Sequence, residues 1–193
     1  METESRFSAP TGFSGSLLVA HPSLEDPHFS QTVILVPVHT EENGALGVVL
    51  NRPTGRTLGE IYPDQTFRKL ADIEIYEGGP VENEQLILTA WKWDAEESSH
   101  KMFFGITSEH AMELMESDES ILIRGYLGYA GWSAGQLELE MESNSWLRKP
   151  LHPDFLKREN SHKLWEELVE ISLQSPLQEP EDWFSPPDHP EWN

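Results

Sequence analysis

Residues 131–135 read Gly-Trp-Ser-Ala-Gly and match the G-x-S-x-G pattern of a nucleophile elbow, the sharp turn that carries the catalytic serine of many hydrolases. Ser133 would be the nucleophile. Asp154 and then His162 or His189 follow it, so the serine, acid and histidine of a catalytic triad stand in the required order. One interpretation of the segment is therefore a serine hydrolase that uses Ser133.

The same segment has a second interpretation, in which it only begins a helix. Ser133-Ala134-Gly135-Gln136 fits a capping box, where the serine side chain caps the first turn and Gln136 bonds back to the serine backbone. The chain lacks an HGGG-type oxyanion loop and the regular strand–helix alternation of the hydrolase fold. We favour the capping role, predict no catalytic residue, and keep the serine hydrolase as an alternative.

The glycines around this segment suggest a third role, in which backbone N–H groups bind an anion. Gly128, Gly131 and Gly135 would leave backbone N–H groups accessible where a helix begins, and a helix N-terminus attracts negative charge. The chain has no Walker lysine and no G-x-G-x-x-G motif. A phosphate-containing ligand at this junction is therefore a hypothesis that rests on the glycines and on the expected helix N-terminus.

The eight histidines of the chain form no recognisable metal motif. H-E-x-x-H is absent, and without cysteine a metal site would need scattered ligands such as His21, Asp26 and His28. We expect these three side chains to lie in a solvated polar turn. No metal and no cofactor is predicted.

His39 and Asn51 stand towards the outer ends of one expected β-hairpin. Side chains in such places are able to converge on one rim and contribute to a binding site. The alternative, which we favour, is that both hydrogen-bond irregular backbone beside Pro37 and Pro53.

The chain is strongly acidic. Lys and Arg number 13 against 34 Asp and Glu, so the formal net charge is -21, and a field of this sign opposes approach to a phosphate backbone. Direct nucleic-acid binding is disfavoured. There is no cysteine, no apolar run long enough to cross a membrane, and no signal-peptide pattern after METESRF. We expect a cytoplasmic protein that does not bind membranes.

The elements that would position these residues are mostly strands in the first half of the chain. Asn43-Gly44 joins two β-rich runs and predicts a hairpin over 31–51, in which Pro37 requires an edge or a bulge. The expected strands are 15–20, 31–39, 45–51, 73–80, 85–91, 101–107 and 119–132, with a polar loop at 92–101. The expected helices begin with caps at Thr57, Ser108 and Ser133, after Asp64, and near Asn160 or Ser161.

This arrangement lacks regular β-α-β-α alternation and predicts the α+β class. We divide the chain into an N-terminal extension, 1–14, a single compact domain, 15–174, and a tail, 175–193. The tail holds five prolines, five acids and three aromatic residues without any base. Two outcomes stay open for it, docking of its aromatic residues on a surface or disorder.

Several segments together resemble the AlgH/YqgE family of bacterial proteins. They read GSLLVAHPSLEDPHFSQTVILV, HTEENGALGVVLNRP, GGPV and LGYAGWSAGQLELE, in this order. The resemblance implies a cytoplasmic bacterial protein whose mixed, split sheet curls into a pseudo-barrel flanked by helices. It supplies no activity, because the family is largely uncharacterised and its link to alginate regulation is a genetic association. The resemblance weakens after Trp146.

The family's pattern does not include Ser133, whose position is often filled by glycine, and this further disfavours a nucleophile. We predict a non-enzymatic binding or regulatory module for an unidentified protein or small molecule. Its site would form where the 39–53 hairpin, the Gly78-Gly79-Pro80 turn and the 128–136 junction meet. The candidate binding residues are His39, Asn51, Gly78, Gly79, Gly128, Tyr129, Gly131, Trp132 and Gln136. A regulator that acts directly on DNA is a further alternative, disfavoured by the net charge.

Overall fold

The computed structural model describes residues 3–6, 12–63, 65–94, 99–152, 155–156 and 161–174. The strands are β1 (Thr3–Arg6), β2 (Ser16–Ala20), β3 (Val33–Thr40), β4 (Gly44–Val49), β5 (Pro53–Thr57), β6 (Glu74–Glu77), β7 (Val81–Asp94), β8 (Ser99–Ile106), β9 (Leu122–Trp132) and β10 (Trp146–Pro150). The α-helices are α1 (Leu58–Ile61), α2 (Ser108–Ser117), α3 (Gln136–Glu142) and α5 (Leu164–Gln174), and the 3-10 helices are η1 (Gln65–Leu70) and η2 (Ser161–Lys163).

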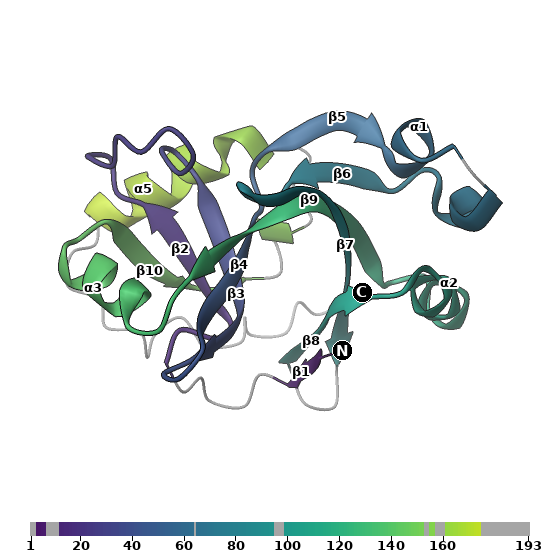
Figure 1. Ribbon diagram of the computed structural model, residues 1–193, viewed down its shortest axis with the longest axis horizontal. Helices are drawn as coiled ribbons and strands as arrows, with labels where there is room; N and C mark the ends of the chain where they lie inside the picture. Colours follow the sequence, from purple (N-terminus) through teal and green to yellow (C-terminus); the bar gives the residue numbers. More distant parts are fainter. Residues whose placement is uncertain are drawn as a thin grey trace, which may run out of the picture.

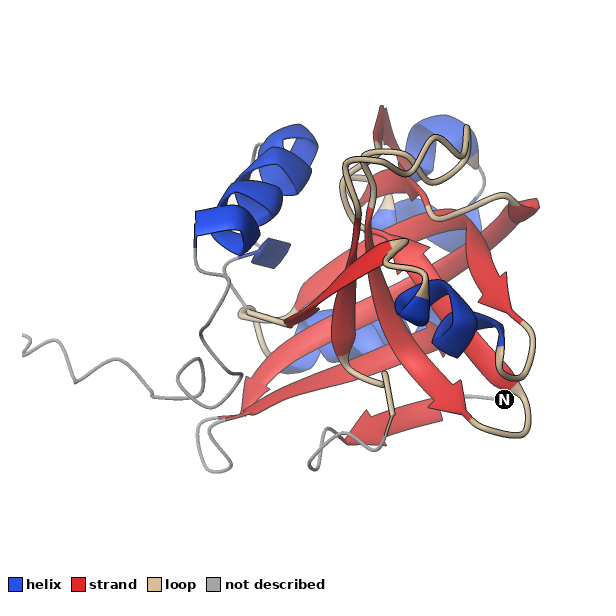
Figure 2. Cartoon of the chain, turned by 90° about the vertical axis from the view of Figure 1, so that its left-hand side faces the viewer, coloured by secondary structure: helices blue, strands red, loops and turns tan. Residues whose placement is uncertain are grey.

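In the described residues these strands form one mixed sheet in the order β1-β8-β7-β9-β4-β3-β2-β10, with β6 beside β9 and β5 beside β6 (Figure 1). The long strand β9 joins the two halves, because it pairs with β7 and with β6 in one half and with β4 in the other. The strands curl around a common interior, and the helices lie outside it (Figure 2). The predicted α+β class and the split sheet curled into a pseudo-barrel are confirmed.

Apolar side chains are buried on both faces of the curled sheet. The interior cluster includes Leu35 and Tyr126, and α5 contributes Leu168 to it. A second cluster, with Trp132, lies under α3, and a third lies under α1, η1 and α2. The helices lie at two opposite ends of the molecule (Figure 1). Helices α3 and α5 lie near β2 and β10, and helices α1 and α2 lie near β6 and β8.

The hairpin predicted around Asn43-Gly44 is present as β3 and β4. Its ladder runs from Ile34 opposite Val49 to Thr40 opposite Gly44, and its register shifts between Leu35 and Val38. This irregularity surrounds Pro37, which cannot donate a hydrogen bond to a ladder. The predicted bulge is confirmed.

Two predicted helix starts differ from the structure. The N-cap of α2 is Thr107 and not Ser108, since the Thr107 hydroxyl accepts the His110 N–H at 3.2 Å. At α3 the N-cap residue is Gly135, with a φ of 75°, and not Ser133. Only half of the predicted capping box forms there: the Gln136 side-chain oxygen accepts the Ser133 backbone N–H at 3.0 Å.

Two strand predictions were incomplete. Helix α3 ends at Glu142 rather than near 145, because Asn144 adopts a φ of 55° and leads into β10, a strand that the sequence did not predict. The polar loop expected at 92–101 is mostly strand, since β7 continues to Asp94 and β8 resumes at Ser99. Strand β10 is held by the distant strand β2, whereas the ends of β7 and β8 pair with each other, Asp94 opposite Ser99, despite their polar composition.

The predicted domain boundaries stay a prediction. The N-terminal extension includes β1, which pairs with β8, and the tail 175–193 lies outside the described residues. None of the helices in the described part of the chain is both long and apolar enough to cross a bilayer.

Candidate functional site

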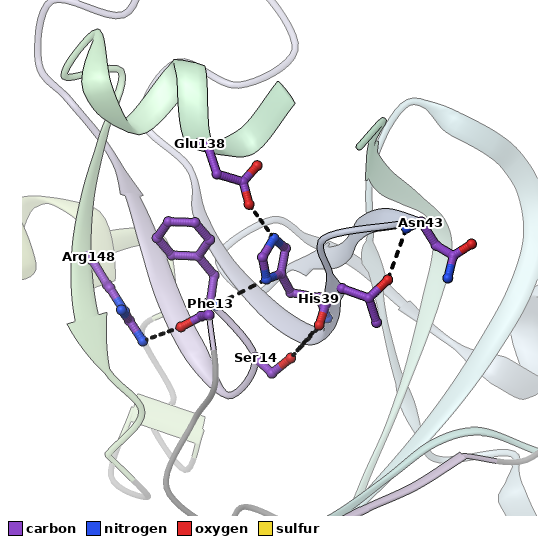
Figure 3. Close-up of polar contacts among 8 residues, drawn as sticks. Phe13, Ser14, His39, Asn43, Glu138 and Arg148 are labelled. Carbon is purple, nitrogen blue, oxygen red and sulfur yellow. Dashed lines mark hydrogen bonds and ion pairs between the residues drawn. The ribbon is translucent and has the colours of Figure 1, made fainter. Parts of the chain in front are cut away.

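Both ring nitrogens of His39 form hydrogen bonds in a cluster that leaves the side chain almost no exposure to solvent (Figure 3). Its Nδ1 accepts the Phe13 backbone N–H at 3.3 Å, and its Nε2 lies 2.7 Å from Oε1 of Glu138, which projects from α3. Because a backbone N–H only donates, the proton of the neutral ring sits on Nε2 and is donated to Glu138. The side chain is 4% exposed, so neither nitrogen is available to an outside ligand.

The rest of this cluster fixes the segment that precedes β2. The Ser14 hydroxyl accepts the His39 backbone N–H at 2.9 Å. Arg148 on β10 donates to the Gly12 carbonyl at 2.7 Å and lies over the Phe13 ring, 5.2 Å from its centroid. These contacts connect β3, β10 and α3 through one short segment, and they give His39 a structural task.

Replacing His39 with alanine should lower the free energy of unfolding by about 2–4 kcal/mol, because it removes a buried ring and leaves the Phe13 N–H and Glu138 without their partner. Urea unfolding followed by tryptophan fluorescence measures this loss. Glu138→Gln is the matched control, since its amide oxygen still accepts from Nε2 and the expected loss is below about 1 kcal/mol. A loss below about 0.5 kcal/mol for His39→Ala would contradict the structural role.

Asn51 lies at the other end of the same hairpin. Its Oδ1 accepts the Val33 N–H at 2.9 Å, and its Nδ2 donates to the carbonyl of Gln31, a residue with a φ of 57°. The antiparallel ladder separates Asn51 from His39 by the length of the hairpin. The favoured interpretation, hydrogen bonding of both side chains to backbone, is confirmed, although the partners are Phe13, Val33 and Gln31 rather than backbone beside Pro37 and Pro53. The alternative, convergence of the two side chains on one rim, is not observed.

The three segments expected to share a site do meet, at a crossing of backbone beside Gly78. The Gly78 N–H donates to the Leu127 carbonyl at 2.8 Å, and the Gly78 carbonyl accepts the Val49 N–H at 2.9 Å. A Cβ on Gly78 would lie 2.2 Å from the Gly128 carbonyl oxygen, and one on Gly79 would lie 2.2 Å from the Tyr129 carbonyl carbon. Glycine is needed here so that two stretches of backbone can approach each other.

Trp132 and Gln136 take part in packing around the second apolar cluster. Trp132 is 5% exposed and stacks on Phe29 with ring centroids 6.4 Å apart. Its indole N–H donates to Glu140 at 2.8 Å, and the Gln136 side-chain amide donates to the other oxygen of Glu140 at 2.9 Å. Tyr129 is half-buried beside the interior cluster, and Gly131 is exposed. A binding role for these residues stays a prediction.

The exposed Ser133 is not assembled into a triad by the described residues. No histidine among them hydrogen-bonds its hydroxyl, and two of the triad candidates, Asp154 and His189, lie outside the described residues. His162 lies in η2. The hydrolase alternative therefore has no geometric support in the described part of the chain, which also holds no group of three or more His, Asp or Glu residues placed to bind a metal.

A cleft of about 420 Å³ opens next to the glycine crossing. We call it the Arg52 cleft, after the cation in its wall. It is lined by His28, Arg52, Thr54, Glu77, Gly79, Pro80, Asn83 and Leu127. Of the predicted binding residues it contains Gly79, and it lies where the end of the hairpin, the Gly78-Gly79-Pro80 turn and β9 come together.

Arg52 is held in a fixed position without a carboxylate partner. Its guanidinium donates through Nη1 to the His28 carbonyl at 2.8 Å and through Nη2 to the Ser30 carbonyl at 3.2 Å. None of the described acidic residues forms an ion pair with it. Sequence reasoning missed Arg52, although it stands between Asn51 and Pro53 in a segment that carried the family resemblance. One available signal was its positive charge, because the chain has only 13 Lys and Arg against 34 Asp and Glu.

A second arginine, Arg124 on β9, is buried in the interior at 5% exposure. It donates to the Leu156 carbonyl and lies over the ring of Tyr76, 4.7 Å from the centroid. Burial raises the pKa of Tyr76 to about 12, against the opposing influence of the Arg124 charge, so the phenol stays protonated near neutral pH. Arg124 does not line the Arg52 cleft.

Residues 17–174 match the AlgH-like family along nearly the whole described domain. The chain belongs to this family. AlgH-like relatives include a UPF0301 protein of Thioalkalivibrio sulfidiphilus, 35% identical over 87% of this chain and 96% of the relative. Another is a UPF0301 protein of Xanthomonas campestris, 38% identical over 73% of this chain and 79% of the relative.

Two solved structures share the AlgH-like fold. The AlgH protein from Pseudomonas aeruginosa superposes with a TM-score of 0.62 at 28% identity, covering 96% of this chain and all of that one (100%). A Corynebacterium diphtheriae protein gives a TM-score of 0.66 at 23% identity, covering 86% of this chain and 90% of its own. These names confirm the family resemblance and state no activity.

Proposed function

We propose that this AlgH-like protein is a non-enzymatic binding module of the cytoplasm, and that a small ligand with an acidic group binds in the Arg52 cleft. The observation that carries the proposal is the guanidinium of Arg52, which lines the cleft, is fixed by two carbonyls and has no described carboxylate partner. A guanidinium has five N–H donors in one plane, and a carboxylate accepts two of them in parallel.

The lack of a counterion is informative because acids are abundant in this chain. With a net charge of -21, a surface arginine has many potential carboxylate partners. Arg52 instead donates to the backbone of the 28–30 loop, and its remaining N–H groups have no partner among the described residues. A fixed cation of this kind binds an anion with little loss of side-chain entropy.

The wall around Arg52 is also fixed before any ligand binds. Gly79 and Leu127 belong to the crossing where backbone contacts backbone, and the Thr54 hydroxyl donates to the Ile75 carbonyl at 2.8 Å. A volume of about 420 Å³ lies at the small end of the range for metabolite pockets. The net charge continues to argue against direct binding to DNA.

Butyrate is a suitable first probe, because it combines one carboxylate with a short apolar chain. We expect it to shift the backbone amide signals of Arg52, Thr54 and Gly79 in ¹H–¹⁵N spectra, with a dissociation constant on the order of 1–10 mM. Arg52→Met should weaken this binding roughly tenfold or more, because hydrogen bonds to charged groups contribute about 1.5–3 kcal/mol.

Arg56→Met is the matched control. Arg56 lies on β5, four residues after Arg52, donates to the Glu60 carbonyl at 3.0 Å and does not line the cleft. Its removal changes the net charge equally but should leave butyrate binding intact. Absence of saturable shifts at the cleft in the wild-type protein, or equal loss of binding in both variants, would overturn the proposed function.

A further inference from the structure

Arg52 and Glu77 are direct neighbours across the start of the β5–β6 pair. The Glu77 N–H donates to the Arg52 carbonyl at 2.9 Å, and the next pair along is Pro53 opposite Tyr76. Residues directly opposite on antiparallel strands project from the same face of the sheet, with Cβ atoms about 4.5–5.5 Å apart. Both residues line the Arg52 cleft.

An arginine and a glutamate in this relation are close enough to form a cross-strand ion pair. They do not form one, because the guanidinium donates to the carbonyls of His28 and Ser30. Glu77 is exposed, and its carboxylate has no hydrogen bond or ion pair with any described residue. The cleft therefore presents a fixed cation and an unpaired anion side by side on one wall.

We infer that the ligand of the Arg52 cleft is a small zwitterion, with its carboxylate on Arg52 and its ammonium group on Glu77. This inference rests on the proposed function, which requires only the carboxylate. Asn83, whose side-chain amide also has no partner among the described residues, adds one donor and one acceptor to the same cleft. An amino-acid-like metabolite satisfies both charges at once.

The charge of the whole protein favours a zwitterion over a simple anion. The field of a chain with a net charge of -21 opposes the approach of an anion, whereas a ligand without net charge feels no such net repulsion. Within the cleft, binding of an anion alone would leave it beside the Glu77 carboxylate. The ammonium group of a zwitterion removes this repulsion and replaces it with an ion pair.

The test compares four probes with the same four-carbon skeleton: butyrate, butylamine, 2-aminobutyrate and 4-aminobutyrate. Each is titrated into the full chain and followed by ¹H–¹⁵N spectra at the cleft amides. We expect at least one aminobutyrate to bind roughly tenfold or more tightly than butyrate and butylamine, since two charge-assisted contacts replace one. Glu77→Gln, which keeps the side-chain shape, should remove this advantage and leave butyrate binding equal or slightly stronger.

Glu84→Gln is the control, because it removes an exposed acid of β7 that does not line the cleft and should retain the preference for aminobutyrate. If butyrate binds as tightly as both aminobutyrates, or if Glu77→Gln keeps their advantage, the zwitterion inference is overturned while the proposed function stands. If none of the four probes binds at the cleft amides, both fail.

Discussion

Replacing Gly128 with alanine is expected to destabilise the protein by about 2–5 kcal/mol, from about 1–2 kcal/mol of left-handed backbone strain and about 1–3 kcal/mol of overpacking. Gly128 has a φ of 70°, and an added Cβ would lie 2.5 Å from the Gly79 carbonyl oxygen and 2.7 Å from that of Val81. Both neighbours are backbone atoms of the crossing and have no side-chain freedom to move. A domain stable by about 5–15 kcal/mol loses much of its margin, so urea unfolding should show a large drop in midpoint.

Gly131→Ala is the control for this prediction. Gly131 lies three residues further along β9, has no left-handed φ, and an added Cβ would come no closer than 3.4 Å to any atom, in this case the ring of Tyr129. We expect a change below about 0.5 kcal/mol. Equal stability of the two variants would mean that the crossing is not closely packed, and the fixed wall of the Arg52 cleft would lose its basis.

The parts of the fold that sequence predicted correctly are those specified by local chemistry. Asn43-Gly44 marks the hairpin because Gly44, which pairs with Thr40 after the 41–43 loop, adopts a φ of 81° that glycine tolerates best. Pro37 requires the bulge because it lacks an N–H. The capping box at Thr57 is likewise local, and the Glu60 carboxylate accepts the Thr57 N–H at 2.8 Å. Each signal acts within a few residues and needs no knowledge of the remaining chain.

One strand that was missed depends on a distant partner. Strand β10 exists because Trp146 and its neighbours pair with β2, more than a hundred residues earlier, and its own composition is mixed. The last residues of β7 and the first of β8 are a different case, because they pair with each other over a short stretch of sequence, Asp94 opposite Ser99 and Trp93 opposite His100. Their polar composition is typical of a loop and concealed this local pairing.

The candidate site, like the fold, has features that local sequence predicted and features that only the tertiary structure shows. The sequence predicted that the hairpin, the Gly78-Gly79-Pro80 turn and β9 would meet, because glycines in all three allow close approach. It selected aromatic and imidazole side chains as ligand contacts, and the structure instead buries Trp132 and encloses His39. The availability of Arg52 and Glu77 follows from how they pair in three dimensions, and residue type alone does not reveal it.

Glu140→Ala is expected to cost about 2–6 kcal/mol of stability, because it leaves two buried indole N–H groups without an acceptor, at about 1–3 kcal/mol each. One carboxylate oxygen of Glu140 accepts both indoles, that of Trp132 at 2.8 Å and that of Trp146 at 2.8 Å. The two rings are 5% and 4% exposed and meet edge to face, so water cannot replace the lost acceptor without opening the cluster. Urea unfolding with near-ultraviolet circular dichroism measures both the stability and the tryptophan environment.

Two variants on the same helix separate this role from the general effect of removing an acid. Glu140→Gln keeps an oxygen for the indoles but turns an NH₂ group towards the Gln136 amide donor, so an intermediate loss of about 1 kcal/mol is expected. Glu142→Ala removes an exposed carboxylate at the C-terminal end of α3, where negative charge opposes the helix dipole, and should be neutral or slightly stabilising. If Glu140→Ala behaves like Glu142→Ala, the shared carboxylate does not hold the indoles. The start of α3 would then be defined by the glycine turn at Gly135, whose φ of 75° needs no side-chain acceptor.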